Sequence, residues 1–142
     1  DPIHHGHLRL AQEALENLDL AQVRWIPAGR PPHRAEPRAT PQQRLQMVRL
    51  AVQDNPAFAV DGAEVASADP SYTVLTLERL RRECGPAQPL VLLTGADAFA
   101  VAVTKKTGTS TIRVMVRILG TFQLKPSSFS SLCWLVIIGL LY

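Results

Sequence analysis

The run Leu90–Thr94 is the feature that most limits what this chain can fold into. It holds four consecutive apolar residues before its threonine. Such a short, uniformly apolar run is typical of a strand that is covered on both faces, as in a parallel sheet with helices on either side. Helical and extended patterns alternate along the residues that precede it. Together these patterns predict an α/β fold with a parallel sheet.

The spacing of apolar residues predicts helices before this run. The first covers about residues 6–18. The second begins at Thr40, where residues 40–43 (TPQQ) form a capping box with proline at the first helical position. The third begins at residues 70–71, with Ser71 as its N-cap, and ends at Gly85. We expect the second helix to bury Leu45, Val48 and Val52, and the third to bury Val74, Leu77 and Leu80.

Extended segments are predicted between these helices. Residues 22–27 have the composition of a strand, and residues 58–65 indicate a short strand pair or an extended run around an Asp-Gly pair. Residues 28–39 are rich in charge and proline and predict a long exposed loop, and loops of this length are often functional. Ligands of parallel sheets bind at the carboxyl ends of the strands, where residues 30–34 and 95–97 fall.

Histidines gather in residues 1–8 (DPIHHGHL), just where the first helix begins. His4 and His7 are three residues apart, so both project from one side of the first turn. Gly6 between them lets a bulky group approach the backbone. A helix start attracts anions, and two imidazoles there can donate to phosphate oxygens whose charge changes during a reaction. This pattern predicts a site that handles phosphate.

Two other interpretations of these histidines compete with that hypothesis. They could simply cap the helix or lie on its surface. The second interpretation is metal binding by His4, His5 and His7. Three neighbouring ligands converge on one ion with difficulty, because consecutive helical positions point about 100° apart.

The four residues from His4 to His7 (HHGH) resemble the HxGH signature of the nucleotidyltransferases, and residues 1–8 are similar to its form in bacterial nicotinate-nucleotide adenylyltransferases. Three further motifs follow in that family's order. Residues 31–34 (PPHR) resemble its loop that closes over the nucleotide phosphates. Residues 70–73 (PSYT) resemble its helix start that receives the nicotinate ring, and residues 95–97 (GAD) its GxD at a strand end.

This resemblance implies a Rossmann-like nucleotidyltransferase fold with a parallel sheet. It also implies transfer of AMP from ATP, bound with Mg2+, to nicotinate mononucleotide, which gives nicotinate adenine dinucleotide and pyrophosphate in NAD synthesis. The implied catalytic residues are His4 and His7, and no residue is implied as a metal ligand. The implied ATP site consists of His4, Gly6, His7, Gly95 and Asp97, and the implied mononucleotide site of His33, Arg34, Tyr72 and Thr73.

Two alternatives stand beside that activity. One is another HxGH adenylyl- or cytidylyltransferase, such as the pantetheine-phosphate enzyme, against which the PPHR and PSYT motifs argue. The other is a fragment without catalysis. In the family a strand and a glycine turn precede the Asp-Pro pair, and this sequence lacks both. We therefore interpret the fold as incomplete, with its first strand missing, and expect little or no activity from these 142 residues.

The resemblance ends near Ala100, where the composition also changes. Residues 1–100 hold ten arginines, no lysine and twelve acidic residues, whereas residues 101–142 hold five basic residues and no acidic one. The family's aromatic pair after the GxD and its later ISSTxIR-type motif have no counterpart in place. We predict a partial nucleotidyltransferase domain at 1–100 and an unmatched tail at 101–142. A domain boundary could cause this change, but we favour a reading-frame shift or a misjoined gene model.

The remaining features bear on partners and location. The net charge of +3 comes from the tail and says little about nucleic acid, so the expected partners are small molecules, ATP and nicotinate mononucleotide. Residues 132–142 are apolar but too few for a membrane span, which needs about 20, and a buried strand or an aggregation-prone end is favoured there over an anchor. In residues 111–119 apolar and other residues alternate as in a strand, with no evident pairing partner.

Cys84 and Cys133 form no CxxC pair, which indicates a reducing compartment, the cytoplasm. A homo-oligomer is compatible with the sequence.

Overall fold

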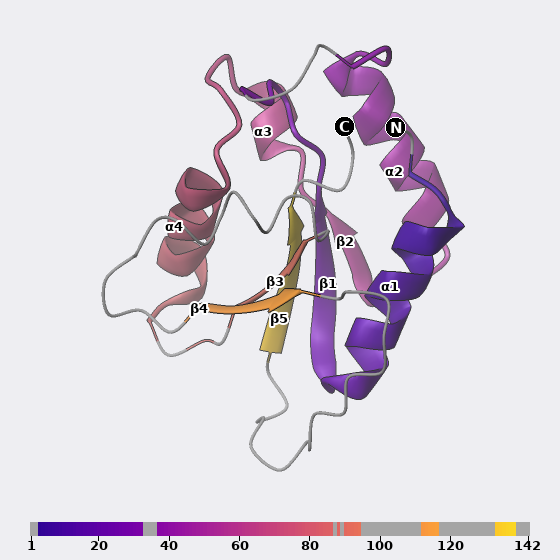
Figure 1. Cartoon of the computed structure of the whole chain (residues 1–142), viewed down its shortest axis with the longest axis vertical. Helices are drawn as coiled ribbons and strands as arrows, with labels where there is room; N and C mark the ends of the chain where they lie inside the picture. Colours follow the sequence, from indigo (N-terminus) through magenta and orange to yellow (C-terminus); the bar gives the residue numbers. More distant parts are fainter. Residues whose placement is uncertain are drawn as a thin grey trace.

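The structure is a computed structural model that describes residues 3–32, 37–86, 88, 90–94, 112–116 and 133–138. In this part of the chain, five parallel strands form one sheet in the order β2-β1-β5-β3-β4. Helices lie on both sides of the sheet (Figure 1). The strands are β1 Leu20–Ile26, β2 Phe58–Val60, β3 Leu90–Thr94, β4 Ile112–Val116 and β5 Cys133–Ile138. The helices are α1 His5–Asn17, α2 Pro41–Val52, α3 Ala63–Ala66 and α4 Thr73–Cys84.

Helices α1 and α2 cover one face of the sheet. Val23 and Trp25 of β1 are fully buried against them, and Val91 and Leu93 of β3 belong to the same cluster. The Trp25 ring meets Phe58 edge to face, with ring centroids 5.6 Å apart. This face therefore buries side chains from β1 and β3 in one continuous core.

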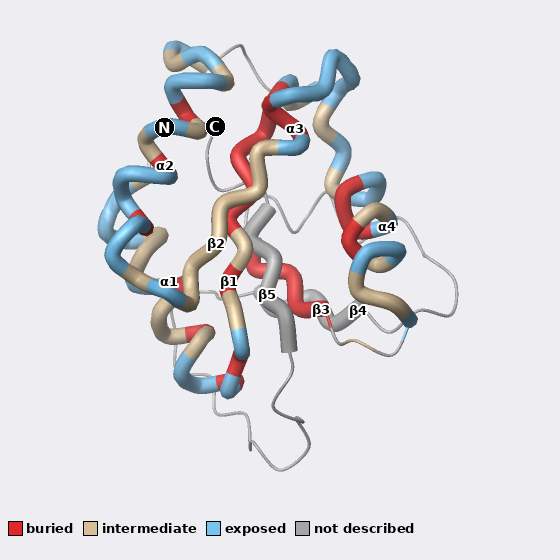
Figure 2. The backbone as a smooth tube through the Cα atoms, turned by 180° about the vertical axis from the view of Figure 1, so that it is seen from behind, coloured by how far each residue is buried: buried red, intermediate tan, exposed pale blue. Residues whose placement is uncertain are grey.

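Helix α4 covers the other face, where Leu77 and Leu80 pack with Ile26, Leu90 and Leu92. Successive residues of β3 thus belong to opposite clusters, and all four of its apolar residues are buried. In Figure 2 the buried residues follow β1 and β3 between the helices. The prediction of a strand covered on both faces is confirmed, because each face needs its own apolar side chains.

Strand β5 lies at the centre of the sheet. It pairs with β1 from Leu20↔Cys133 to Ile26↔Ile138 and with β3 from Leu90↔Trp134 to Leu93↔Ile137. Both β1 and β3 are therefore paired along the edges that face the centre of the sheet. The strand predicted within residues 132–142 is confirmed, and the one within 111–119 is β4, which pairs with β3. The division of the chain at residue 100 stays a prediction.

An ionic cluster ties α4 to the sheet. Arg79 donates to Asp61 and to Glu83, both at 2.6 Å, and Arg24 of β1 donates to Glu83 at 3.0 Å. Asp61 follows β2, so the cluster links β1, the end of β2 and α4. These ion pairs add directional contacts to the apolar packing of that face.

Local sequence rules correctly predicted how α2 begins and where α4 ends. The reciprocal capping box at Thr40 and Gln43 is present at the start of α2. Gly85 ends α4 with a φ of 80°, a backbone conformation that favours glycine. Within the described ranges, no helix has the length and apolar character of a membrane span.

Other expectations about elements and burial are wrong. After β2 the chain forms α3 rather than a second strand. Its N-cap is Gly62, without a side-chain cap, and Asp61 just before it accepts a hydrogen bond from the Ala63 amide at 2.9 Å. Val74 is exposed, and Thr76 takes the buried position and donates to Glu64 at 2.5 Å. In α2, Leu45 is only half-buried.

The α4 core provides a test of the packing. Leu80→Ala should lower the free energy of unfolding by about 2–5 kcal/mol, because Leu80 is 1% exposed and its loss leaves a cavity. Leu75→Ala on the same helix is the matched control. It should change stability by no more than about 0.5 kcal/mol, since Leu75 is 52% exposed. Urea unfolding measures both, and equal losses would contradict the packing of α4 described here.

Candidate active site

The candidate site begins at the start of α1, where two histidines cap the helix. His4 is the N-cap, and its Nδ1 accepts a hydrogen bond from the Gly6 amide at 3.1 Å. His7 returns the contact, since its Nδ1 accepts from the His4 amide at 3.3 Å. The capping role that competed with a functional one is therefore present, and it fixes where both rings lie.

These hydrogen bonds also determine which ring nitrogen carries the proton. Because each Nδ1 accepts a hydrogen bond, the neutral form of each imidazole carries its proton on Nε2. The two rings stack with centroids 3.8 Å apart. Burial, together with the neighbouring His4, lowers the pKa of His7 to about 4. At neutral pH His7 is thus an uncharged ring with one N–H to donate.

Gly6 has a local structural role, and its expected part in binding stays a prediction. A Cβ at this position would lie 2.9 Å from Cε1 of His4, so the missing side chain makes room for the His4 ring. The Gly6 amide is bound by that ring, and the His7 amide donates to the His4 carbonyl at 2.9 Å. An anion at this helix start would therefore meet imidazole N–H groups before these backbone amides.

The start of α4 is the second part of the site. Its N-cap is Tyr72, not Ser71 as predicted, and no side chain caps this helix. Thr73 is its first residue, and Tyr72 is 40% exposed. The first amides of α4 thus have no capping side chain, and they carry the positive end of the helix dipole.

Ser71 does not cap α4 because its hydroxyl is engaged by another segment. Its Oγ accepts from the amides of Gly29 and Arg30, at 2.8 and 3.1 Å, and the Ser71 amide donates to the Arg30 carbonyl at 2.8 Å. Gly29 and Arg30 lie just after β1. A tertiary contact has replaced the local cap that the sequence predicted.

Arg44 is a site residue that the sequence analysis missed. It is 3% exposed and donates to the carbonyls of Ala28, Gly29 and Ala39. Burial lowers the pKa of its guanidinium. The periodicity could have found it, because positions 44, 48 and 52 are spaced at i, i+4 and i+8 on one helix face.

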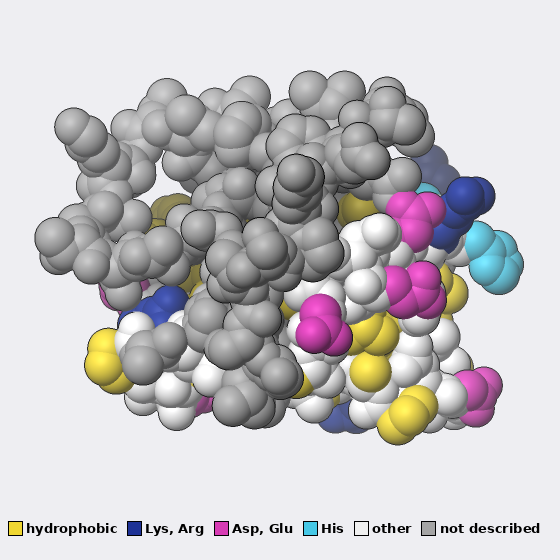
Figure 3. Space-filling view, turned by 90° about the horizontal axis from the view of Figure 1, so that it is seen from below, with side chains coloured by type: hydrophobic (Ala, Val, Ile, Leu, Met, Phe, Trp, Pro, Cys, Tyr) yellow, Lys and Arg dark blue, Asp and Glu magenta, His cyan; other side chains and the backbone are white. Residues whose placement is uncertain are grey.

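A cavity of about 830 Å³ lies beside this segment. Among the described residues, Arg30, Arg38 and Arg44 line it, together with the start of α2. In the view from below, acidic and basic side chains both appear among the described residues (Figure 3). The three arginines therefore give the cavity a basic lining that suits an anion.

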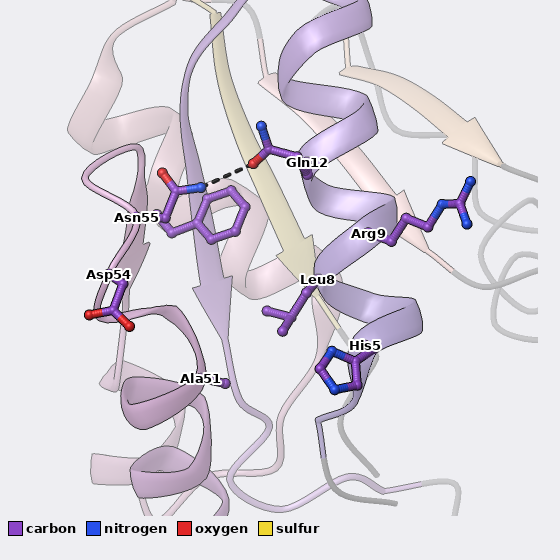
Figure 4. Close-up of a pocket in the computed structure, with 8 residues that line it drawn as sticks. His5, Leu8, Arg9, Gln12, Ala51, Asp54 and Asn55 are labelled. Carbon is purple, nitrogen blue, oxygen red and sulfur yellow. Dashed lines mark hydrogen bonds between the residues drawn. The ribbon is translucent and has the colours of Figure 1, made fainter.

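A second cavity, of about 470 Å³, lies between α1 and the end of α2 (Figure 4). His5 and Leu8 line it, and Asn55 donates to Gln12 across it at 3.0 Å. His5 thus lines a cavity of its own, apart from the stacked pair. Among the described residues no group of three or more His, Cys, Asp or Glu side chains is placed to hold a metal ion.

The structure places only some of the predicted site residues. His33, Arg34, Gly95 and Asp97 lie outside the described residues. The histidine pair lies at the start of α1, and Tyr72 with Thr73 lies at the start of α4. Both helices begin towards the carboxyl end of β1, on opposite faces of the sheet (Figure 1). These two groups therefore flank the edge of the sheet where parallel folds bind ligands.

Comparison with known proteins gives consistent matches. A model of the cytidylyltransferase-like family matches residues 1–136. A probable nicotinate-nucleotide adenylyltransferase of Dechloromonas aromatica is 64% identical over 104 residues, which are 73% of this chain and 48% of that protein. Proteins of the same name from Marinobacter nauticus and Halorhodospira halophila are 50% and 52% identical, over 70% of this chain and 46% and 45% of their own lengths. The chain spans about half the length of these curated relatives.

The histidine stack can be tested by its titration. In an NMR titration the His7 ring should change protonation near pH 4 rather than near 6.5. The unfolded chain then binds this proton more readily, so stability should fall as the pH drops from 6.5 to about 4. His4→Asn keeps a capping oxygen but removes the stacked ring, and should raise the pKa of His7. His5→Ala is the control and should leave it unchanged. A His7 midpoint near 6.5 in the unaltered protein would contradict the stack.

Proposed function

The chain belongs to the cytidylyltransferase-like family, and from this we propose that its protein transfers AMP from ATP to nicotinate mononucleotide. The products are nicotinate adenine dinucleotide and pyrophosphate. The observation that carries the proposal is the stacked pair of His4 and His7, whose Nδ1 atoms are engaged so that the Nε2–H groups are left to donate. The names of the relatives support this choice of substrates.

The proposed reaction needs no covalent intermediate. A phosphate oxygen of the mononucleotide attacks the α-phosphorus of ATP in line, and the bond to the leaving pyrophosphate breaks. Catalysis is then mostly positioning and charge stabilisation. His4 binds ATP phosphates, and His7 donates from Nε2 to the charge that builds at the α- and β-phosphates.

Mg2+ belongs to the substrate in this proposal. This ion keeps several waters and commonly binds through substrate phosphates, so it enters with ATP and neutralises the leaving pyrophosphate.

Gly95 and Asp97 would hold the adenosine ribose, and His33 and Arg34 would hold the phosphate of the mononucleotide. We place the reaction in the cytoplasm, with small molecules as substrates.

His7→Ala tests the proposed chemistry. We use the term full-length protein for one that carries these residues at the length of the curated relatives. In it, His7→Ala should lower kcat at least about a hundredfold with a smaller effect on KM, because one preorganised donor to the transition state is lost. His5→Ala is the matched control and should leave kcat within about twofold of the unaltered value.

Steady-state release of pyrophosphate gives both constants. A higher KM at unchanged kcat would make His7 a ground-state contact instead. Product from phosphopantetheine, with none from nicotinate mononucleotide, would overturn the proposed substrate.

The start of α4 supports a preference for the acid over the amide. Nicotinate and nicotinamide mononucleotides have nearly the same shape, so the site must distinguish them by charge and donor pattern. The uncapped first amides of α4 suit a carboxylate, which accepts with both oxygens. A carboxamide turns its NH2 towards them and leaves donors unpaired, at about 1–3 kcal/mol each.

Thr73→Pro tests this recognition. Proline is tolerated at the first position of a helix, so the change removes one amide donor while α4 remains. The full-length protein should prefer the acid by roughly one to four orders of magnitude in kcat/KM, and Thr73→Pro should narrow that gap. Thr73→Ala keeps the amide and should preserve it. Equal use of both substrates by the unaltered protein would defeat this account of α4.

A further inference from the structure

The first residues after β1 are held by the segment before α4. We call Ala28, Gly29 and Arg30 the loop foot, because the loop that carries His33 and Arg34 begins there. Ser71 makes three hydrogen bonds with it, two through its hydroxyl and one through its amide, at 2.8–3.1 Å. Both amides of the loop foot that bind the hydroxyl are therefore satisfied by one side chain.

Arg44 of α2 holds the same loop from another side. Its Nη2 donates to the carbonyls of Ala28 and Gly29 at 2.6 and 3.1 Å, and its Nη1 donates to that of Ala39 at 2.5 Å. Ala28 lies at the beginning of the loop and Ala39 at its end. One buried guanidinium thus joins both ends. Burying a charge is costly unless its donors are paired. Carbonyls at both ends of the loop pair the two Nη groups of Arg44, whereas its buried Nε has no partner among the described residues.

The loop foot also lies against α3. A Cβ on Gly29 would come within 2.0 Å of the Glu64 carbonyl oxygen, so the two backbones touch and no other residue fits. The Glu64 carboxylate in turn accepts a buried hydrogen bond from Thr76 of α4. The loop foot, α3 and α4 are therefore one connected unit.

We propose that Ser71 and Arg44 are positioning residues, which set the separation between the loop foot and the uncapped start of α4. This inference rests on the proposed function. Nicotinate mononucleotide has a carboxylate at one end and a phosphate at the other. A site that binds both ends needs two groups of donors at a fixed distance, and Ser71 joins the loop foot to the residues that begin α4. Holding them in place before binding lowers the entropy cost of binding.

The test is a separation of the two Michaelis constants in the full-length protein. Ser71→Ala leaves the amides of Gly29 and Arg30 without their acceptor, so KM for nicotinate mononucleotide should rise roughly tenfold or more. KM for ATP should change by less than about twofold, because the histidine pair on α1 is untouched. Ser71→Thr keeps the hydroxyl and should restore a low KM for the mononucleotide. Arg44→Met should act like Ser71→Ala, and Arg44→Lys less severely.

Asn55→Ala is the matched control for a general loss of stability. Asn55 also accepts from a backbone amide, that of Ala57 at 3.0 Å, but it lies before β2, at the opposite end of the strands from the loop foot. The Asn55→Ala variant should leave both Michaelis constants unchanged.

Amide hydrogen exchange provides a readout that does not depend on turnover. Exchange at Gly29 and Arg30 should accelerate in Ser71→Ala and stay slow in Asn55→Ala.

The outcomes separate this inference from the function on which it rests. One outcome is that the unaltered protein is active and that Ser71→Ala exchanges faster at the loop foot but keeps its KM for the mononucleotide. This result overturns the positioning role alone. An equal rise of both Michaelis constants also overturns it. An unaltered protein that does not use nicotinate mononucleotide overturns the proposed function, and the positioning role with it.

Discussion

The pairing of β5 with β1 on one side and β3 on the other is the interaction on which the described structure depends. In the described sheet, backbone hydrogen bonds link the pair β2–β1 to the pair β3–β4 only through β5. Each apolar cluster draws residues from both pairs, Trp25 with Val91 on one face and Ile26 with Leu92 on the other. The backbone pairing in the middle therefore brings together the strands that α1, α2 and α4 cover.

The candidate site uses this frame at the carboxyl end of β1. Capping fixes the histidine pair on α1, while the start of α4 is left without a side-chain cap. The hydroxyl that would serve as that cap, on Ser71, holds the loop foot instead. One local bond is thereby exchanged for two tertiary ones, and the amides of α4 remain free of a capping side chain. The same exchange both anchors the loop foot and leaves the first amides of α4 without a side-chain cap.

The sequence predicted what short-range chemistry determines. The capping box at Thr40, the apolar run of β3 and the glycine that ends α4 all depend on residues within a few positions of one another. Ser71 was predicted wrongly because its partners lie 41 and 42 residues away. Arg44 was missed because an arginine in an amphipathic helix usually faces solvent, and its carbonyl partners belong to a loop. The long-range place of β5 could not be inferred from its composition.

The position of β5 has a consequence for how the chain is made. A ribosome adds residues in order, so β1 and β3 both emerge before the strand that lies between them. Among the described strands, none fills the place between β1 and β3 during that interval, and open strand edges pair readily with other chains. Contacts between residues so distant in sequence also form slowly, because a long loop must close first. The described sheet is thus divided until β5 is made, and chaperones that cover exposed strand edges would act then.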